Sequence, residues 1–178
     1  LDDKAMNPIK NGADLILASN VFAHADDLES MAESMKKLVK PDGKIIIEVQ
    51  YLLNTIQDLT FDNIYHEHTN YWSLSALNIF LKKLDLKIFK VEKIDTHGGS
   101  IRAYVSQDKS ILVDRSVNTT LQEEEEFGLK NISTYLEFGK KIENLKKKVV
   151  KNLKVLKEKY SSIIGYGAPA KATTALNF

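Results

Sequence analysis

The sequence has no cysteine among its 178 residues, which excludes disulfide bonds and metal sites built on thiolates. It has no apolar run long enough to span a bilayer. Its first residues, from Leu1 to Lys4, contain neither a signal-peptide core nor an initiating methionine. We therefore expect a cytoplasmic protein with no membrane role, whose chain begins inside a longer polypeptide.

An excess of charge of one sign is also lacking, because 25 basic residues are balanced by 24 acidic ones and the net charge is +1. This balance gives no overall attraction to nucleic acid or to anionic lipid. The apolar fraction, 43%, is enough for a hydrophobic core and excludes a disordered chain. The length allows one ordinary domain or two small ones.

The first 110 residues alternate between strand and helix patterns, which predicts an α/β fold with a sheet covered by helices. Asp26 and Glu29 form a predicted capping box at the start of the first helix, which ends before residues 41–43. Ser73 begins a second helix after a loop of roughly twenty residues, long enough to be functional. The predicted strands span residues 14–18, 44–49, 86–94 and 101–105, the last two being antiparallel.

The second half is helical in pattern from Thr119. One long amphipathic helix carries apolar residues at spacings of three and four from Tyr135 to Tyr160. Its other face holds nine lysines between residues 140 and 159, against two glutamates. We interpret this face as the solvated side of a helix packed along its apolar stripe. A nucleic-acid surface is the alternative, but no aromatic residues alternate with the lysines.

A short strand at residues 161–164, a turn with Gly165 and Gly167, and a helix start are predicted near the end of the sequence. This arrangement can offer backbone N–H groups and a positive helix end to a phosphate, and Lys171 would add charge. The spacing matches neither the dinucleotide fingerprint nor the nucleoside-triphosphate loop. A plain tight turn is therefore the alternative.

Three of the four histidines lie in two short polar segments, residues 20–24 and 65–71, and His97 stands beside two glycines. This distribution is typical of the lining of an active site. If residues 65–71 are extended, alternate side chains point the same way, so His66 and His68 would share one side.

Three interpretations of these histidines stay open. The H-x-H spacing suits a metal, but His24 or His97 would have to supply a further imidazole ligand. Acid–base catalysis needs one imidazole, with a pKa of about 6.5, that a tyrosine hydroxyl or a carboxylate orients. The segment contains all three groups. Half-buried structural histidines are the third interpretation.

Four motifs in order resemble those of the S-adenosylmethionine-dependent sugar C-methyltransferases that act on nucleotide-linked deoxysugars. They span residues 14–24, 65–71, 97–104 and 165–171. The resemblance implies the C-terminal half of a Rossmann-like methyltransferase domain, a helical connector and the start of a second Rossmann-like domain. These units would occupy residues 1–110, 111–160 and 161–178.

In that family a carbon beside a 4-keto group loses a proton, and the enolate attacks the methyl group of S-adenosylmethionine. The resemblance implies that His68 is the base and that Tyr65, Glu67 and His24 orient the sugar and its developing oxyanion. It implies cofactor binding by Asn20 and Val21. Asn20 would also contact the nucleotide-sugar, whose phosphates would meet the following residues: Arg102, Gly165, Gly167 and Lys171.

The sequence departs from the family pattern, because it lacks the cysteine-rich zinc segment, the first strand with its glycine-rich loop, and the acidic residue that grips the donor ribose. We therefore expect no metal site and weak or no binding of S-adenosylmethionine by these 178 residues alone. The interrupted sheet has an unpaired edge that would favour a homo-oligomer. Two other functions stay open: a non-catalytic interaction module working through the lysine-faced helix, and a metal-dependent hydrolase using His66 and His68.

Overall fold

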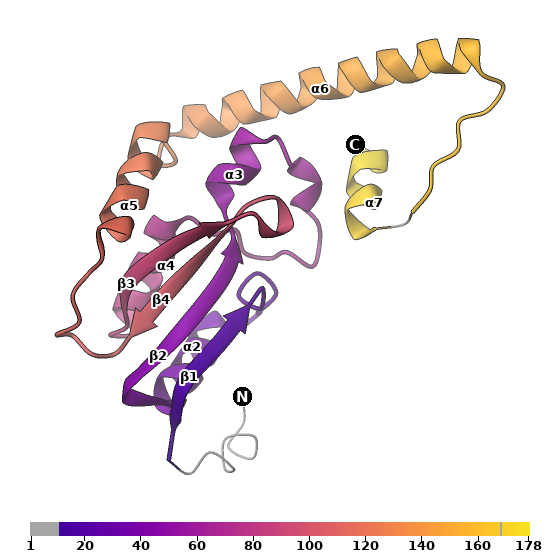
Figure 1. Cartoon of the computed structure of the whole chain (residues 1–178). Coiled ribbons are helices and arrows are strands. Elements are labelled where there is room, and N and C mark those ends of the chain that lie inside the picture. The colour runs from indigo at the N-terminus through magenta and orange to yellow at the C-terminus, as the bar shows by residue number, and fades with distance from the viewer. Residues whose placement is uncertain (1–10, 168) are drawn as a thin grey trace.

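The computed structural model describes residues 11–167 and 169–178, and its centre is a four-stranded sheet in the order β1-β2-β4-β3 (Figure 1). β1 and β2 are parallel, whereas β4 is antiparallel to both β2 and β3. The strands are β1 (Ala13–Ser19), β2 (Val39–Gln50), β3 (Lys87–Ile94) and β4 (Ser100–Ser106). This sheet confirms the predicted α/β class and the antiparallel pairing of the last two strands.

The α-helices are α2 (Leu28–Leu38), α3 (Leu52–Gln57), α4 (Leu74–Lys83), α5 (Arg115–Phe127), α6 (Ile132–Lys159) and α7 (Ala170–Asn177). Two short 3-10 helices, η1 (Phe61–Asn63) and η2 (Thr96–Gly98), lie near the carboxyl end of β2. α2 and α4 cover the same face of the sheet (Figure 1). In the described residues, no helix has both the length and the apolar character needed to cross a membrane.

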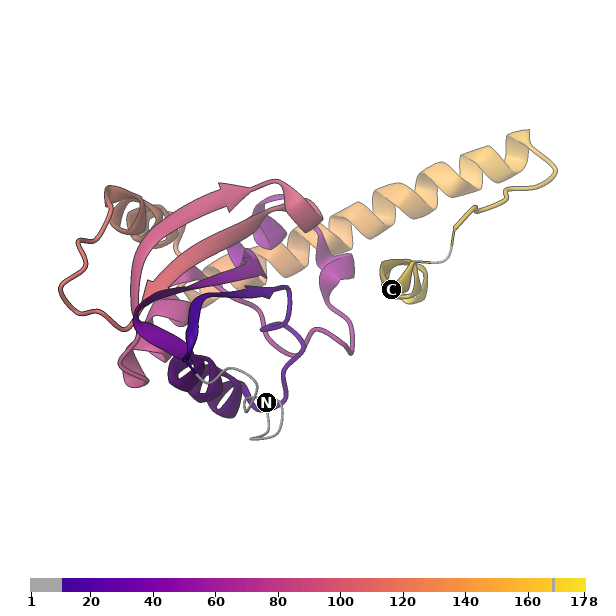
Figure 2. The same ribbon diagram turned by 60° about the horizontal axis from the view of Figure 1, so that its bottom comes forward.

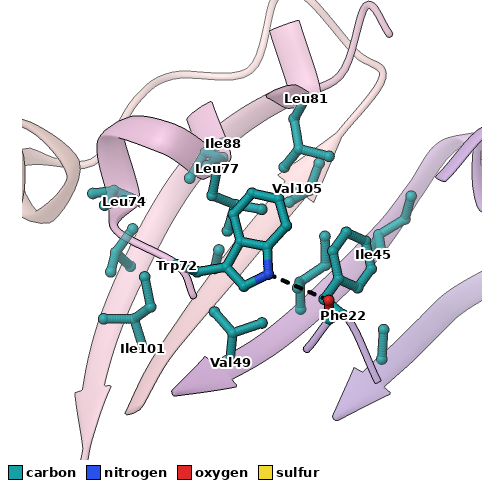
Figure 3. Packing of buried hydrophobic residues seen from close by; sticks show 14 of the residues in the cluster. Phe22, Ile45, Val49, Trp72, Leu74, Leu77, Leu81, Ile88, Ile101 and Val105 are labelled. Carbon is teal, nitrogen blue, oxygen red and sulfur yellow. Dashed lines mark hydrogen bonds between the residues drawn. The ribbon is translucent and has the colours of Figure 1, made fainter. Parts of the chain in front are cut away.

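The hydrophobic core lies between that face and the two helices. Alternate residues of β2 and β4 point into it, as the period of a strand requires, and are fully buried: Ile45, Ile47, Val49, Ile101, Ala103 and Val105. Trp72 packs edge-on against Phe22, with ring centroids 6.1 Å apart, and donates its indole N–H to the Phe22 carbonyl oxygen at 3.4 Å (Figure 3). This bond joins the segment after β1 to the one before α4.

The opposite face of the sheet is open. Leu17 is 67% exposed there, although it stands in the middle of a strand. Arg102 lies across from Glu48 on β2 and Glu92 on β3, and its guanidinium donates to the Glu48 carboxylate at 2.9 and 3.2 Å. Among the described residues, β1 and β3 are the outer strands.

Two local predictions in the first half are wrong. Asp27 rather than Asp26 caps α2, because its carboxylate accepts the N–H of Ser30 at 2.9 Å, so Glu29 completes no capping box with Asp26. Residues 41–43 belong to β2 rather than to a turn. A register shift in the β1–β2 ladder absorbs them, and Gly43 permits the close approach, since a Cβ there would lie 2.8 Å from the Ala13 carbonyl oxygen.

Three further predictions need correction. The stretch between β2 and α4 contains α3 and η1 instead of being a plain loop. The helical pattern from Thr119 is divided, because α5 already begins at Arg115 and ends at Phe127, and the next residue, Gly128, has a left-handed conformation with φ of 83°. Residues 161–164 form an exposed coil, not a strand, since a single segment without a neighbouring strand has no ladder to join.

The predicted packing of the long helix along its apolar stripe is also wrong. α6 projects away from the sheet (Figures 1 and 2), and Ile142 is its one buried residue. Val149, Leu153 and Leu156 on the outer part of the helix are 41 to 47% exposed. The segment after α6 returns, so that Phe178, next to α7, packs at a tilt against Phe61 of η1 with ring centroids 5.1 Å apart. The domain boundaries at residues 110 and 160 stay a prediction.

Candidate active site

A small pocket of about 170 Å³ opens where β1 and β2 end. Asn20 directly follows β1, and Gln50 is the last residue of β2. The full lining is Asn20, Ala23, His24, Gln50, Tyr65, His68, His97 and Lys171. Ligands of open α/β sheets bind outside the carboxyl ends of the parallel strands, so this position is where a functional site is expected.

Backbone hydrogen bonds hold the two histidine-bearing segments together. The Ala23 carbonyl oxygen accepts the N–H groups of Thr69 at 3.0 Å and Asn70 at 3.3 Å. The Asn70 side-chain amide donates to the Ala25 carbonyl oxygen at 3.3 Å. The sequence placed these segments more than forty residues apart, and these bonds bring His24 and His68 to 4.9 Å between ring centroids.

His68 has a defined tautomer. Its Nδ1 lies 2.8 Å from the carbonyl oxygen of Asn63. A carbonyl can only accept a hydrogen bond, so Nδ1 carries the proton and Nε2 holds the lone pair. The Tyr65 hydroxyl lies 3.2 Å from Nε2 and donates to it. His68 therefore presents a basic nitrogen beside a hydroxyl group, which is the arrangement of a general base.

The surroundings favour the neutral form of the His68 imidazole, with a proton on Nδ1 and none on Nε2. Burial is the main cause that lowers its pKa, and the neighbouring His24 and Lys171 lower it further, against the Asn63 hydrogen bond and Glu67, which act in the opposite direction. A base must be deprotonated to accept a proton. The lowered pKa favours the neutral imidazole, the form that a general base needs, at neutral pH.

His24 is oriented in the same way as His68. Its Nδ1 lies 2.8 Å from the carbonyl oxygen of Glu67, so the proton is on Nδ1 and Nε2 is free to accept. The backbone of Glu67, rather than its carboxylate, makes this contact. The Glu67 side chain is 57% exposed and does not line the pocket.

The H-x-H pair does not converge. The chain turns at this point, with the His68 N–H donating to the Tyr65 carbonyl oxygen at 3.0 Å. His66 is 88% exposed, and its nearest charged partner is the Glu67 carboxylate at 4.0 Å. The prediction that His66 and His68 share a side is therefore wrong. Within residues 11–167 and 169–178, no group of three or more histidine, aspartate or glutamate side chains could hold a metal.

The other predicted site residues divide into two groups. Asn20 and Lys171 reach the pocket together with His24, Tyr65 and His68. Arg102 lies on the open sheet face in its ion pair with Glu48, outside the pocket. Three further predicted residues also lie outside the pocket lining and are exposed: Val21, Gly165 and Gly167. Their roles stay predictions.

Gln50 and Asn63 were not among the site residues predicted from the sequence. Gln50 is a polar residue placed directly after a buried strand, the same signal that identified Asn20 after β1. Asn63 gave no local signal, because its contact with His68 is made by a backbone carbonyl.

Comparison with known proteins places this chain in a family. Residues 3–91, half of the chain, match a family model described as a methyltransferase domain. The chain belongs to the methyltransferase family. Residues 95–178 of this methyltransferase match a model described as the C-methyltransferase C-terminal domain. Methyltransferases of this kind use S-adenosylmethionine as the methyl donor, so the predicted family and cofactor are confirmed at this level.

The methyltransferase chain is 30% identical over 165 residues to C-methyltransferase NovU from Streptomyces niveus. The alignment covers 92% of this chain and 39% of that relative, so the chain spans about two fifths of its length. The solved structure of the mitomycin 7-O-methyltransferase MmcR is also similar, with a TM-score of 0.44 and 17% identity. The superposition covers 57% of this chain and 31% of the MmcR chain.

Proposed function

We propose that this chain carries the base and part of the substrate site of a C-methyltransferase that acts on a nucleotide-linked keto-deoxysugar. The observation that supports this most is the tautomer of His68, whose unprotonated Nε2 belongs to a pocket at the carboxyl ends of β1 and β2. Methylation at carbon needs such a base, because a C–H bond must first be broken.

The proton to be removed lies on the carbon next to the sugar carbonyl. His68 Nε2 takes this proton, and the C–H electron pair moves to form an enolate with negative charge on oxygen. The pocket contains two groups that can stabilise this oxyanion: the Lys171 ammonium, and the Tyr65 hydroxyl, which stops donating to Nε2 once Nε2 is protonated. Asn20 and His24 complete the wall that orients the sugar ring.

S-adenosylmethionine, when bound, supplies an electrophilic methyl group on a positively charged sulfur. Asn20 and the exposed Val21, directly after β1, are the residues of this chain that would border the donor. The pocket, at about 170 Å³, is smaller than the roughly 300–1,000 Å³ of typical ligand sites. It fits the reacting end of a sugar, not a donor and a nucleotide-sugar together.

Proton exchange tests the proposed base without methyl transfer. The full-length protein is incubated with nucleoside-diphosphate-linked 4-keto-deoxysugars in D₂O, and exchange of the proton beside the carbonyl is followed by NMR. We expect exchange with the unmodified protein and none with His68→Ala, while the substrate still binds. Equal exchange by both proteins would contradict the proposal.

Donor binding is tested by calorimetry on the 178-residue chain and on a version extended at both ends. We expect S-adenosylmethionine to bind the extended version much more tightly. Tight binding by the short chain would refute the expectation that its small pocket is insufficient for the donor.

A further inference from the structure

Two amide side chains, those of Gln50 and Asn63, form a link behind His68. Gln50 ends β2 and borders the pocket, whereas Asn63 ends η1 and is 2% exposed. The Gln50 Nε2 lies 3.2 Å from the Asn63 Oδ1 and 3.1 Å from the carbonyl oxygen of His97. One amide group therefore connects the sheet to η1 and η2.

The chemistry of the partners fixes the orientation of both amides. The His97 carbonyl oxygen can only accept, so the Gln50 atom that faces it must be the amide nitrogen. The same nitrogen faces Asn63, which must then present its side-chain oxygen. Each hydrogen of the Gln50 amide thus has its own acceptor, and neither amide can flip without losing a bond.

This link ends at the imidazole. Asn63 is anchored through its side chain by Gln50 and through its N–H by the Thr60 carbonyl oxygen at 3.1 Å. Its own carbonyl oxygen then accepts the proton on His68 Nδ1 at 2.8 Å. The hydrogen bond that one ring nitrogen of a histidine makes decides which nitrogen carries the proton and which keeps the lone pair.

We propose that Gln50 and Asn63 are positioning residues that hold His68 in its Nδ1-protonated tautomer, with Nε2 available to the pocket. The proposal rests on the proposed function of His68 as the base. Because Gln50 is the last residue of β2, the link ties the turn that carries His68 to the rigid sheet.

The test replaces Gln50 with leucine, which has a similar size but no amide. Gln107→Leu is the matched control, because the Gln107 Nε2 also donates to two backbone carbonyl oxygens, those of Val39 at 2.9 Å and Lys40 at 3.1 Å. Gln107 does not line the pocket. The ring nitrogens of His68 are observed by ¹⁵N NMR in the 178-residue chain, and turnover is measured in the full-length protein.

In Gln50→Leu, we expect the ¹⁵N shifts of His68 to move from the pure Nδ1–H tautomer toward a mixture of both tautomers. We expect kcat to fall about 10- to 100-fold, the range of a misplaced catalytic group, with a much smaller change in KM. Gln107→Leu should leave the tautomer and kcat unchanged. An unchanged His68 tautomer in folded Gln50→Leu would overturn the proposal, as would an equal change in Gln107→Leu.

If Gln50→Leu does not fold, Gln50→Asn is measured in its place, with Gln107→Asn as its control. Because its side chain is shorter by one methylene, the amide no longer reaches Asn63. We therefore expect a mixture of both His68 tautomers in this variant as well. The NMR readout separates this proposal from the proposed function. If His68 is not the base, the His68→Ala variant still promotes proton exchange. The tautomer of His68 in the Gln50 variants would nevertheless change, because it depends on the link and not on catalysis.

Discussion

The hydroxyl of Tyr65 lies 3.2 Å from Nε2 of His68. The two residues are three positions apart and meet because the chain turns between them, with the His68 N–H bonded to the Tyr65 carbonyl oxygen. Nε2 is also the one ring nitrogen that can accept a proton, since Nδ1 is engaged with Asn63. The hydroxyl therefore stands next to the point where proton transfer would occur.

Replacement of His68 by glutamine is expected to lower kcat by about 10²- to 10⁴-fold, because general-base catalysis contributes that much to rate. KM should change little, since the pocket keeps a polar side chain of similar size. The measurement is steady-state kinetics of the full-length protein. His66→Gln is the control, because His66 is 88% exposed. A comparable loss in that variant would show that the chemistry does not depend on His68.

The pH dependence of kcat/KM should show an acidic limb with its midpoint below the usual imidazole pKa of about 6.5. Burial, His24 and Lys171 lower the pKa of His68 in the folded protein, so the base stays active to lower pH. The folded state also binds this proton less readily than the unfolded state. The free energy of unfolding should therefore decrease as pH falls through about 6.5 and below. A midpoint above that value would contradict this reading.

Lys171→Met should raise the pKa of His68, because it removes a positive charge that opposes protonation of the imidazole. NMR titration of the 178-residue chain measures the shift. Lys157→Met, on the projecting part of α6, serves as the control and should leave the titration unchanged. If both variants titrate like the unmodified chain, Lys171 does not act on the site.

Two glycine substitutions should change stability in opposite directions. Gly128 ends α5 with φ of 83°, and an added Cβ would lie 2.9 Å from the Asn131 Nδ2. Gly128→Ala should therefore lower the free energy of unfolding by more than about 1 kcal/mol.

Gly139 lies inside α6 with open space around it. Gly139→Ala should raise that free energy by roughly 0.5–1 kcal/mol. Urea denaturation distinguishes the two outcomes.

Glu124 is a buried carboxylate whose two oxygens accept the backbone N–H groups of Leu74 and Ser75 at the start of α4. Glu124→Gln keeps one acceptor but turns an amide nitrogen toward the other N–H. We expect a loss of about 1–3 kcal/mol in the free energy of unfolding, the range for hydrogen bonds to a charged group. Glu125→Gln, at an exposed position, should have almost no effect in the same urea titration.

The parts of the fold that the sequence predicts are those set by burial with a regular period. The strands at residues 14–18 and 44–49 and the helix after Ser73 are confirmed, because one apolar face or run defines each of them. The end of α5 at Gly128 also had a sequence signal, a glycine at a helix end, but the continuous helical pattern around it was stronger. The choice between the neighbouring Asp26 and Asp27 depends on backbone angles that composition does not specify.

The candidate site was predictable where polar residues follow buried strands or gather in one segment. His24, Tyr65, His68 and Asn20 reach one pocket as expected. The turn that places Tyr65 against His68, and exposes His66, is decided by hydrogen bonds to Asn63 and Ala23. Such contacts use backbone carbonyl oxygens, which every residue has, and they leave no periodic signal in the sequence. The same reason explains why Asn63 was missed, whereas Gln50 had the signal of a polar residue directly after a buried strand.

The segment from Tyr160 to Pro169 carries the chain from the outer end of α6 back to η1, and every described residue in it is exposed. Because Lys171 follows this segment and His68 precedes it, the imidazole and the ammonium belong to two pieces that a single endoproteolytic cut would separate. Limited digestion would therefore produce a nicked molecule in which Lys171 stays beside His68 only through the non-covalent contacts of the last helix, such as those of Phe178 with Phe61 and of the Thr174 hydroxyl with the Ile64 carbonyl oxygen.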